Sequence, residues 1–227
     1  MEKNVIITRC KEENVILSRT IQEIGYIPIA SPMISYKVVL CDFAKFKSYS
    51  NLIVTSKFAA QIIAEHYPYD VNVYVVGGES ANILGKNSKI NVLGIYDGVA
   101  ALLEALDNSQ KYLYCSGNHI SMDIPFADRC IIYNTEYADS LSQEALEIIS
   151  QNRADFIMFY SKNSAQNFID LIKNHIHLQN LQNSVVIAIS EEVCSILGGY
   201  IKNVLFPKNP NADEMLALLR KIKTREI

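Results

Sequence analysis

Short apolar runs alternate along the chain with segments in which apolar residues recur at helical spacing. Apolar runs of about four to eight residues are typical of buried strands, and a spacing of three to four is typical of amphipathic helices. Residues 97–107, for instance, place Leu102 and Leu106 on one helical face. The segments predicted as strands are 4–8, 27–30, 51–54, 73–76, 90–93, 111–114, 129–133, 155–159, 185–189 and 203–206.

This alternation of strands and helices predicts an α/β fold whose parallel sheets are covered by helices on both faces. Sheets of this kind bind ligands beyond the carboxyl ends of their strands. Polar residues that directly follow a predicted strand are therefore the first candidates for a functional site.

An internal repeat divides the chain into two similar halves. Residues 52–61 (LIVTSKFAAQ) have a counterpart in residues 157–166 (IMFYSKNSAQ), and each segment reads as a strand, a polar turn with Ser-Lys, and a helix. A second strand, turn and helix follow each of them, at 73–81 and 186–193. Turns of the same kind are predicted at 8–10 and 115–118. Such self-similarity indicates two related α/β domains.

Two extended segments, 31–40 and 131–137, are candidates for the connections between the halves. Pro32 disfavours helical backbone at the residue before it. If both segments cross between the halves, residues 1–32 pack with 137–227, and 38–131 form an inserted lobe. Periodicity alone leaves this connectivity open.

Composition narrows the function classes. The chain has 227 residues, of which 49% are hydrophobic, and a formal net charge of -3. It contains no Lys/Arg-rich run, so we expect no nucleic-acid partner. No apolar run approaches the roughly 18 residues of a membrane span, and no secretory signal is present, so we expect no membrane contact. Five scattered cysteines without metal-binding spacing favour a cytoplasmic protein with free thiols and no metal.

The polar turns are candidates for binding an anion. Serine and threonine at a helix start accept hydrogen bonds from backbone N–H groups, and the helix dipole favours negative charge there. One such turn is usually only a helix cap, but several at strand ends indicate a site. Arg9 would add a cation, although it could instead pair with an acid on the following helix. The candidate binding residues are Thr8, Arg9, Thr55, Ser56, Lys57, Gly77, Gly78, Ser116, Gly117, Asn118, Ser161, Lys162, Ser190 and Glu191.

Tyr133 is the candidate catalytic side chain. It lies in the second extended segment, where it would face a cleft between the halves. A phenol keeps its proton at neutral pH and can donate it, or a hydrogen bond, to a reacting group. The alternative is a tyrosine packed at a domain hinge. Cys10 and Cys115 follow or end strands, but the sequence shows no histidine partner that would make either a nucleophile.

Taken in order, short segments over nearly the whole chain resemble the uroporphyrinogen-III synthase family. The order and spacing of the segments carry the resemblance, because each one alone is common. The matching segments are the opening strand with Thr8-Arg9, Gly25 followed by Pro28 and Pro32, Thr55-Ser56 after a strand, Val75-Val76-Gly77, Ile131-Ile132-Tyr133-Asn134-Thr135, Phe159-Tyr160-Ser161 and Ile189-Ser190.

The resemblance implies a bilobed fold of two parallel-sheet α/β domains joined by a two-stranded β linker. The first, discontinuous domain would comprise 1–34 and 136–227, and the second, inserted domain 35–135. It also implies a cofactor-free lyase that cyclises hydroxymethylbilane, a linear tetrapyrrole with eight carboxylates, to uroporphyrinogen III with loss of water and inversion of ring D. Tyr133 matches the residue expected to assist departure of the hydroxyl. We expect a monomer that contacts hydroxymethylbilane synthase transiently.

The chain departs from the family pattern at two turns. Residues 191–194 (EEVC) stand where the family often has Pro-x-Thr-Ala, and residues 119–122 (HISM) lack a basic residue expected there. These departures support an alternative function, a non-catalytic two-lobed module that binds a tetrapyrrole or another anion. A transferase acting on a phosphorylated substrate at the same helix ends is a third reading, but the sequence lacks a nucleotide loop and an acidic metal motif.

Overall fold

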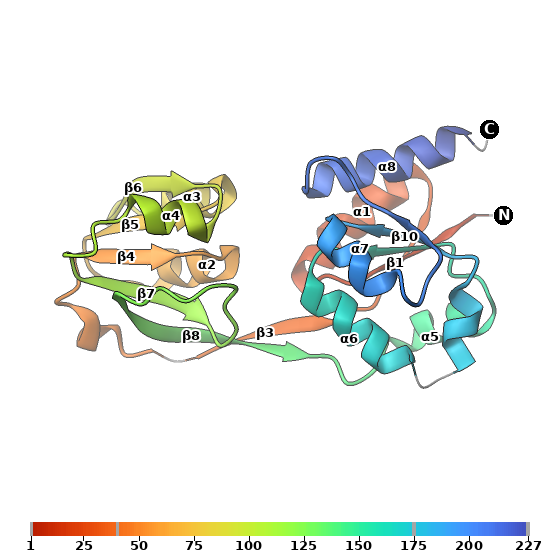
Figure 1. The fold of residues 1–227 in the computed structure, drawn as a ribbon, viewed down its shortest axis with the longest axis horizontal. Coiled ribbons are helices and arrows are strands. Elements are labelled where there is room, and N and C mark those ends of the chain that lie inside the picture. The colour runs from red at the N-terminus through yellow and green to blue at the C-terminus, as the bar shows by residue number, and fades with distance from the viewer. Residues whose placement is uncertain (1, 40, 174–175, 226–227) are drawn as a thin grey trace. The chain divides into compact units, whose positions relative to one another are not determined.

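The computed structural model describes residues 2–39, 41–173 and 176–225 and divides into two compact units. Unit 1 comprises Met1–Ser35 and Glu136–Ile227, and unit 2 comprises Tyr36–Thr135. Both boundaries fall within strands, β3 (Ile34–Val38) and β8 (Ala127–Tyr137), which are neighbours in one sheet (Figure 1). Unit 1 is therefore discontinuous in sequence, with unit 2 inserted into it.

Unit 1 contains a five-stranded sheet in the order β11-β10-β9-β1-β2, and all of its strand pairs are parallel. The strands are short and almost entirely apolar because both faces of the sheet are covered by helices. The strand order reverses direction between β1 and β9, which is where a sheet of this type opens a crevice for a ligand. The strands are β1 (Asn4–Ile7), β2 (Ile27–Ala30), β9 (Phe156–Phe159), β10 (Val185–Ala188) and β11 (Asn203–Leu205).

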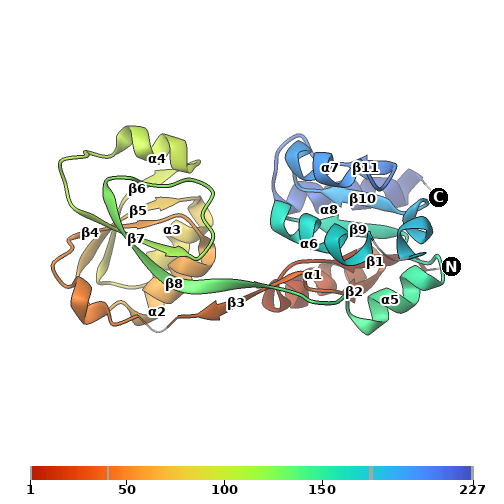
Figure 2. The same cartoon turned by 60° about the horizontal axis from the view of Figure 1, so that its bottom comes forward.

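Helices cover both faces of the unit 1 sheet (Figures 1 and 2). Two of them bury their apolar stripes against one face, and three pack on the other. The first set is α1 (Lys11–Ile24) and α8 (Ala212–Arg225); the second is α5 (Gln143–Ser150), α6 (Lys162–Ile172) and α7 (Glu191–Leu197), with a 3-10 helix, η2 (Ile176–Leu181), beside them.

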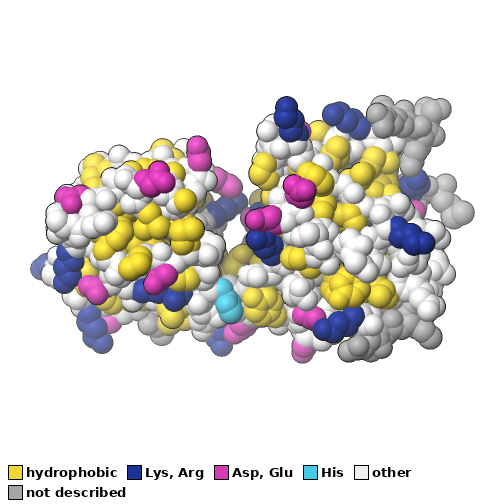
Figure 3. Space-filling model, viewed as in Figure 1, with side chains coloured by type: hydrophobic (Ala, Val, Ile, Leu, Met, Phe, Trp, Pro, Cys, Tyr) yellow, Lys and Arg dark blue, Asp and Glu magenta, His cyan; other side chains and the backbone are white. Residues whose placement is uncertain are grey.

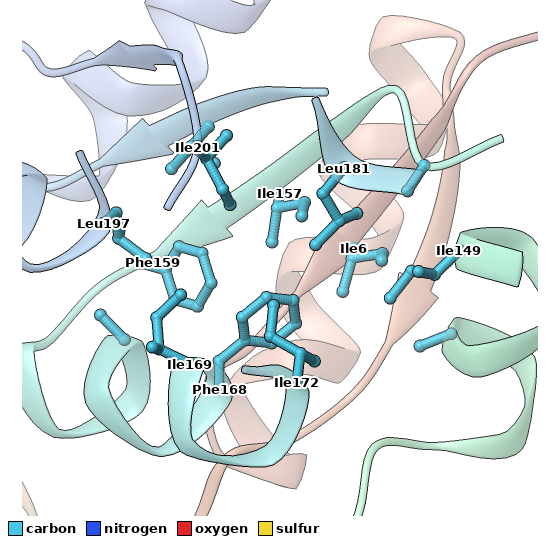
Figure 4. Close-up of a cluster of buried hydrophobic side chains, with 14 of the residues drawn as sticks. Ile6, Ile149, Ile157, Phe159, Phe168, Ile169, Ile172, Leu181, Leu197 and Ile201 are labelled. Carbon is cyan, nitrogen blue, oxygen red and sulfur yellow. The ribbon is translucent and has the colours of Figure 1, made fainter. Parts of the chain in front are cut away.

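Aromatic and aliphatic side chains from β9 and α6 form the centre of the larger unit 1 core. Phe159 and Phe168 are fully buried and meet edge to face with ring centroids 5.1 Å apart. Ile6, Ile157 and Ile169 converge on the same cluster (Figure 4). This packing holds the carboxyl ends of β1 and β9 in fixed positions, and those ends carry the unit 1 candidates.

Unit 2 contains a six-stranded sheet in the order β3-β8-β7-β4-β5-β6. The pairs β4–β5, β4–β7, β5–β6 and β7–β8 are parallel, and the strand order reverses between β4 and β7. Helices α2 and α3 pack on one face and α4 on the other. The elements are η1 (Phe43–Phe46), β4 (Asn51–Val54), α2 (Lys57–His66), β5 (Val71–Val76), α3 (Gly78–Leu84), β6 (Ile90–Tyr96), α4 (Val99–Ala105) and β7 (Tyr112–Gly117).

The expected α/β class with parallel sheets is confirmed, but the prediction for the end of β7 is wrong. The sequence predicts a strand that stops at residue 114 and a turn at 115–118 that opens a helix. The strand instead continues to Gly117, because Cys115 and Ser116 are buried and pair with β8. The following segment, 118–126, contains no helix. No helix among the described residues is long and apolar enough to cross a membrane.

Candidate functional site

The carboxyl ends of β4 and β7 lie side by side where the unit 2 strand order reverses, and polar side chains meet there. The hydroxyls of Thr55 and Tyr114 are hydrogen-bonded at 2.8 Å. Burial raises the pKa of Tyr114, so its phenol remains protonated. The phenol of Tyr133 donates a hydrogen bond to Ser56 Oγ at 3.1 Å. Two hydrogen-bonded pairs of hydroxyl groups therefore lie at this edge, with Tyr114 in the core cluster of one face of the sheet and Tyr133 in that of the other.

The Tyr133 side chain is held by contacts with two aromatic rings that are stacked on each other. Its ring meets those of Tyr36 and Phe58 edge to face, with centroids 5.6 Å and 5.1 Å apart. Only 7% of the residue is exposed. Tyr133 is therefore packed, as expected for the alternative of a tyrosine at a domain hinge. Its hydroxyl is also hydrogen-bonded to Ser56, a candidate binding residue.

The first turn of α2 is capped as the sequence predicts. Ser56 Oγ accepts a hydrogen bond from the backbone N–H of Ala59 at 3.1 Å. The next residue, Lys57, forms an ion pair with Glu79 in the first turn of α3, with 2.5 Å between Nζ and Oε1. Gly77 caps α3 at a φ of +86°, a conformation that side-chain-bearing residues rarely adopt. The ion pair therefore links the start of α2 to the start of α3, and Glu79 offsets the positive charge of Lys57.

At the end of β7, Ser116 is buried and Asn118 organises the following turn. The Asn118 side-chain oxygen accepts hydrogen bonds from the backbone N–H groups of His119 and Thr135. The guanidinium of Arg129 lies against the same turn and donates to Ser116 Oγ at 2.9 Å. Arg129 is not among the residues that the sequence indicates, because it lies on a strand whose alignment with β7 a single sequence does not reveal.

In unit 1, the candidates at the end of β1 are engaged within the fold. Thr8 is fully buried and its hydroxyl donates to the carbonyl of Met158 at 2.8 Å, which links β1 to β9. Arg9 makes two hydrogen bonds to Glu13 on α1, and its guanidinium lies 4.6 Å from the ring centroid of Tyr160. The second expected role of Arg9, pairing with an acid on the following helix, is confirmed.

The β9 and β10 ends of unit 1 repeat the arrangement seen in unit 2. Ser161 caps α6 by accepting from the backbone N–H of Ser164 at 3.1 Å. Lys162 pairs with Glu192 in the first turn of α7 at 2.7 Å, as Lys57 pairs with Glu79. Ser190 begins α7 without a side-chain cap bond, and Glu191 is the first residue of that helix.

The cysteine thiols are poorly suited to nucleophilic chemistry. Burial raises the pKa of Cys10 to about 11, and the pKa of the fully buried Cys115 is raised well above its usual value for the same reason. A thiolate is the reactive form, so both thiols are inert near neutral pH. In the described parts of the chain, no group of His, Cys, Asp or Glu is arranged to hold a metal ion.

The face drawn in Figure 3 shows acidic and basic side chains interspersed over both units. Within each unit, hydroxyl and amide side chains and lysine–glutamate ion pairs lie at the carboxyl edge of the sheet, beside the reversal of strand order. These features define a two-domain α/β protein whose sheets each present a polar edge at the position where folds of this class bind ligands.

Comparison with known proteins names the family. The model of the family described as uroporphyrinogen-III synthase HemD matches residues 16–217. The chain belongs to this family, which carries out the synthase step of tetrapyrrole biosynthesis. It is also 30% identical to the uncharacterized protein RP474 of Rickettsia prowazekii over 270 aligned positions, which cover 96% of this chain and 97% of the relative.

Solved structures of synthases share the fold. The uroporphyrinogen-III synthetase from Helicobacter pylori superposes with a TM-score of 0.65 at 15% identity, over 98% of this chain and 100% of the other. A mutant uroporphyrinogen III synthase from the extremely thermophilic bacterium Thermus thermophilus gives a TM-score of 0.61 at 11% identity, over 98% of both chains. At these identities the match concerns the fold, and the side chains of the site must be argued from this chain.

Proposed function

We propose that the chain is a cofactor-free lyase that converts hydroxymethylbilane to uroporphyrinogen III, with loss of water and inversion of ring D. Membership of the synthase family supports the reaction. The observation that carries the role of this site is the Tyr133 phenol, whose O–H donates to Ser56 Oγ at 3.1 Å. This pair lies at the carboxyl edge of a parallel sheet, where such folds bind their ligands.

The chemical problem is the departure of a hydroxyl group, which leaves poorly as hydroxide. The Tyr133 phenol would turn its hydrogen from Ser56 to the substrate hydroxyl as the carbon–oxygen bond breaks, so that the oxygen leaves as water. The pyrrole nitrogen stabilises the resulting azafulvene cation. Attack by the substituted carbon of ring D gives a spiro intermediate, and rearrangement to the product releases a proton that restores the phenol.

Correct ring closure also requires the substrate to be held, because hydroxymethylbilane closes unaided to the type I isomer. Its eight carboxylates need hydrogen-bond donors and cations. The capped helix starts at Ser56 and Ser161, together with Lys57 and Lys162, supply these groups in the two units. Holding the linear substrate in the conformation that leads to the spiro intermediate is catalysis by positioning. Positioning of this kind can lower an activation barrier by about 7–11 kcal/mol in favourable cases.

Isomer analysis tests the proposal directly. The purified chain is added to hydroxymethylbilane synthase, which supplies the unstable substrate, and the oxidised products are separated as type I and type III isomers. We expect the type III isomer to dominate. Type I product alone, identical to the control without the chain, would refute the synthase activity.

A second candidate is a non-catalytic member that binds a tetrapyrrole or another anion. Glu191 and Glu192 favour it, because they stand at a turn where the family often has Pro-x-Thr-Ala, and this departure is expected of a member that has lost catalysis. Titration calorimetry with uroporphyrinogen III, kept reduced, separates the two functions. Binding combined with an absence of type III product would support the second candidate.

A further inference from the structure

Arg129 is the basic side chain that holds the end of β7. Its Nε donates to Ser116 Oγ at 2.9 Å, and its Nη2 donates to the backbone oxygens of Gly117 at 2.6 Å and Asn118 at 2.9 Å. Hydrogen bonds from a charged donor are stronger than neutral ones. Three such bonds fix residues 116–118 relative to β8, where the chain leaves the strand for a segment that is not helical.

The turn at residues 116–118, which Arg129 holds, is also hydrogen-bonded to the backbone at and after Tyr133. The N–H of Asn118 donates to the carbonyl of Tyr133 at 3.1 Å. The Asn118 side-chain oxygen accepts from the N–H of Thr135 at 2.8 Å. The backbone on the carboxyl side of Tyr133 is therefore tied to the turn.

Gly117 contacts the Tyr133 ring itself. A Cβ added to Gly117 would lie 2.5 Å from Cε2 and Cζ of Tyr133 and 2.8 Å from its hydroxyl oxygen. Carbon atoms that are not bonded do not approach so closely, so any side chain at position 117 must displace the phenol end of the ring. The residue type at 117 is therefore fixed by the place that the Tyr133 hydroxyl occupies.

A register shift explains how Tyr133 reaches this place. Ser116 pairs with Ile131, but Gly117 pairs with Tyr133, so one residue of β8 is skipped. Successive side chains of a regular strand point to opposite faces, yet Ile132 and Tyr133 are both buried in the same core cluster. A bulge of this kind re-aims a side chain, and bulges are enriched next to active sites.

We propose that Arg129 and Gly117 are positioning residues for Tyr133: the arginine fixes the turn after β7, and the glycine leaves room for the phenol beside Ser56. The proposal rests on the proposed function; it adds Arg129, which no sequence motif indicates, and gives Gly117, a candidate binding residue, a positioning role. Neither residue needs to touch the substrate. Both act by holding the Tyr133 hydroxyl where the leaving group is expected.

The substitution Gly117→Ala tests the position of the phenol without altering its chemistry. We expect kcat for type III product to fall on the order of 10- to 100-fold, the loss typical of a displacement near 1 Å, with KM changed much less. Type I isomer should increase, because substrate that is not turned over closes unaided. Gly199→Ala is the matched control, since a Cβ there meets nothing within 4 Å.

The substitution Arg129→Gln tests the turn and is best measured together with Tyr133→Phe. If Arg129 acts through Tyr133, the double variant loses no more kcat than Tyr133→Phe alone, because coupled residues are not additive. A substrate-binding or general structural role gives additive losses instead. Arg153→Gln, at another exposed arginine, is the control for removal of a charge. Thermal unfolding of every variant identifies losses caused by misfolding.

The outcomes separate this proposal from the synthase activity itself. A wild-type chain that gives type III product, with Gly117→Ala and Arg129→Gln both at wild-type kcat, would overturn the positioning roles alone. Additive losses in the Arg129 and Tyr133 double variant would also overturn the role of Arg129. If Arg129→Gln does not fold, Gly117→Ala still decides the matter, since it alters one packing contact at the end of a strand. A wild-type chain without type III product would refute the proposed function instead.

Discussion

Replacing Tyr133 by phenylalanine removes one oxygen atom and leaves the aromatic packing in place. The ring keeps its edge-to-face contacts with Tyr36 and Phe58, so the stability lost is that of the hydrogen bond to Ser56, about 0.5–1.5 kcal/mol. Loss of a group that donates a proton in the transition state typically lowers the rate about 10²- to 10⁴-fold. A catalytic phenol therefore predicts a large loss of kcat with a small loss of stability, whereas a phenol that is only packed predicts the small loss of stability alone.

The assay follows type III product over time in the coupled reaction, with the uncatalysed type I product as an internal reference. Unfolding in urea gives the stability of the same preparation. Tyr49→Phe serves as the control, because it also removes a phenol that donates to another side chain, Asp128, near the amino ends of β4 and β8 and away from their carboxyl ends. Tyr133→Phe with wild-type kcat would refute a role for the phenol in the chemistry, whatever its effect on stability.

Three further predictions follow from individual contacts. Glu192→Gln and Glu79→Gln should each change stability by less than about 1 kcal/mol, because both ion pairs are exposed, and should lower KM by releasing a lysine for the substrate; an unchanged KM would show that the lysines do not bind it. Thr8→Val should cost about 1 kcal/mol in urea unfolding through the lost bond to Met158 and leave KM unchanged; a raised KM would place this side chain in contact with substrate. Because the pKa of Cys10 is raised from 9.0 to about 11, its thiol is neutral at pH 8 in the folded chain, and mass spectrometry should find it alkylated by iodoacetamide far more slowly than in urea; equal rates would contradict the burial.

The sequence predicts much of the fold because parallel strands buried on both faces are nearly continuous apolar runs. For the same reason Ser56 and Ser161, which closely follow such runs, are predicted as helix caps, and both accept the expected bonds. The function of Arg129 is not predictable in this way. It depends on which residue of β8 lies opposite Ser116, and a skipped residue in the ladder changes that pairing without leaving any mark in composition or periodicity.

The two units correspond by position in their sheets, and this correspondence shows where they differ. Strands β4 and β5 of unit 2 match β9 and β10 of unit 1, as the sequence repeat indicates, and β7 and β8 then match β1 and β2. Tyr133 lies on β8 of unit 2, and the matching strand of unit 1, β2, is followed by Ser31. Ser31 is fully buried, and its hydroxyl accepts a hydrogen bond from the N–H of Ser142.

Both units therefore provide a capped helix and a lysine–glutamate pair at matching strand ends, but among the described residues a phenol donates to the capping serine in unit 2 alone. A capped helix start beside a lysine suits the carboxylates of the substrate. A single leaving group requires only one donor. This asymmetry favours departure of the hydroxyl at unit 2, and it explains why substitutions around β7 and β8 should lower kcat.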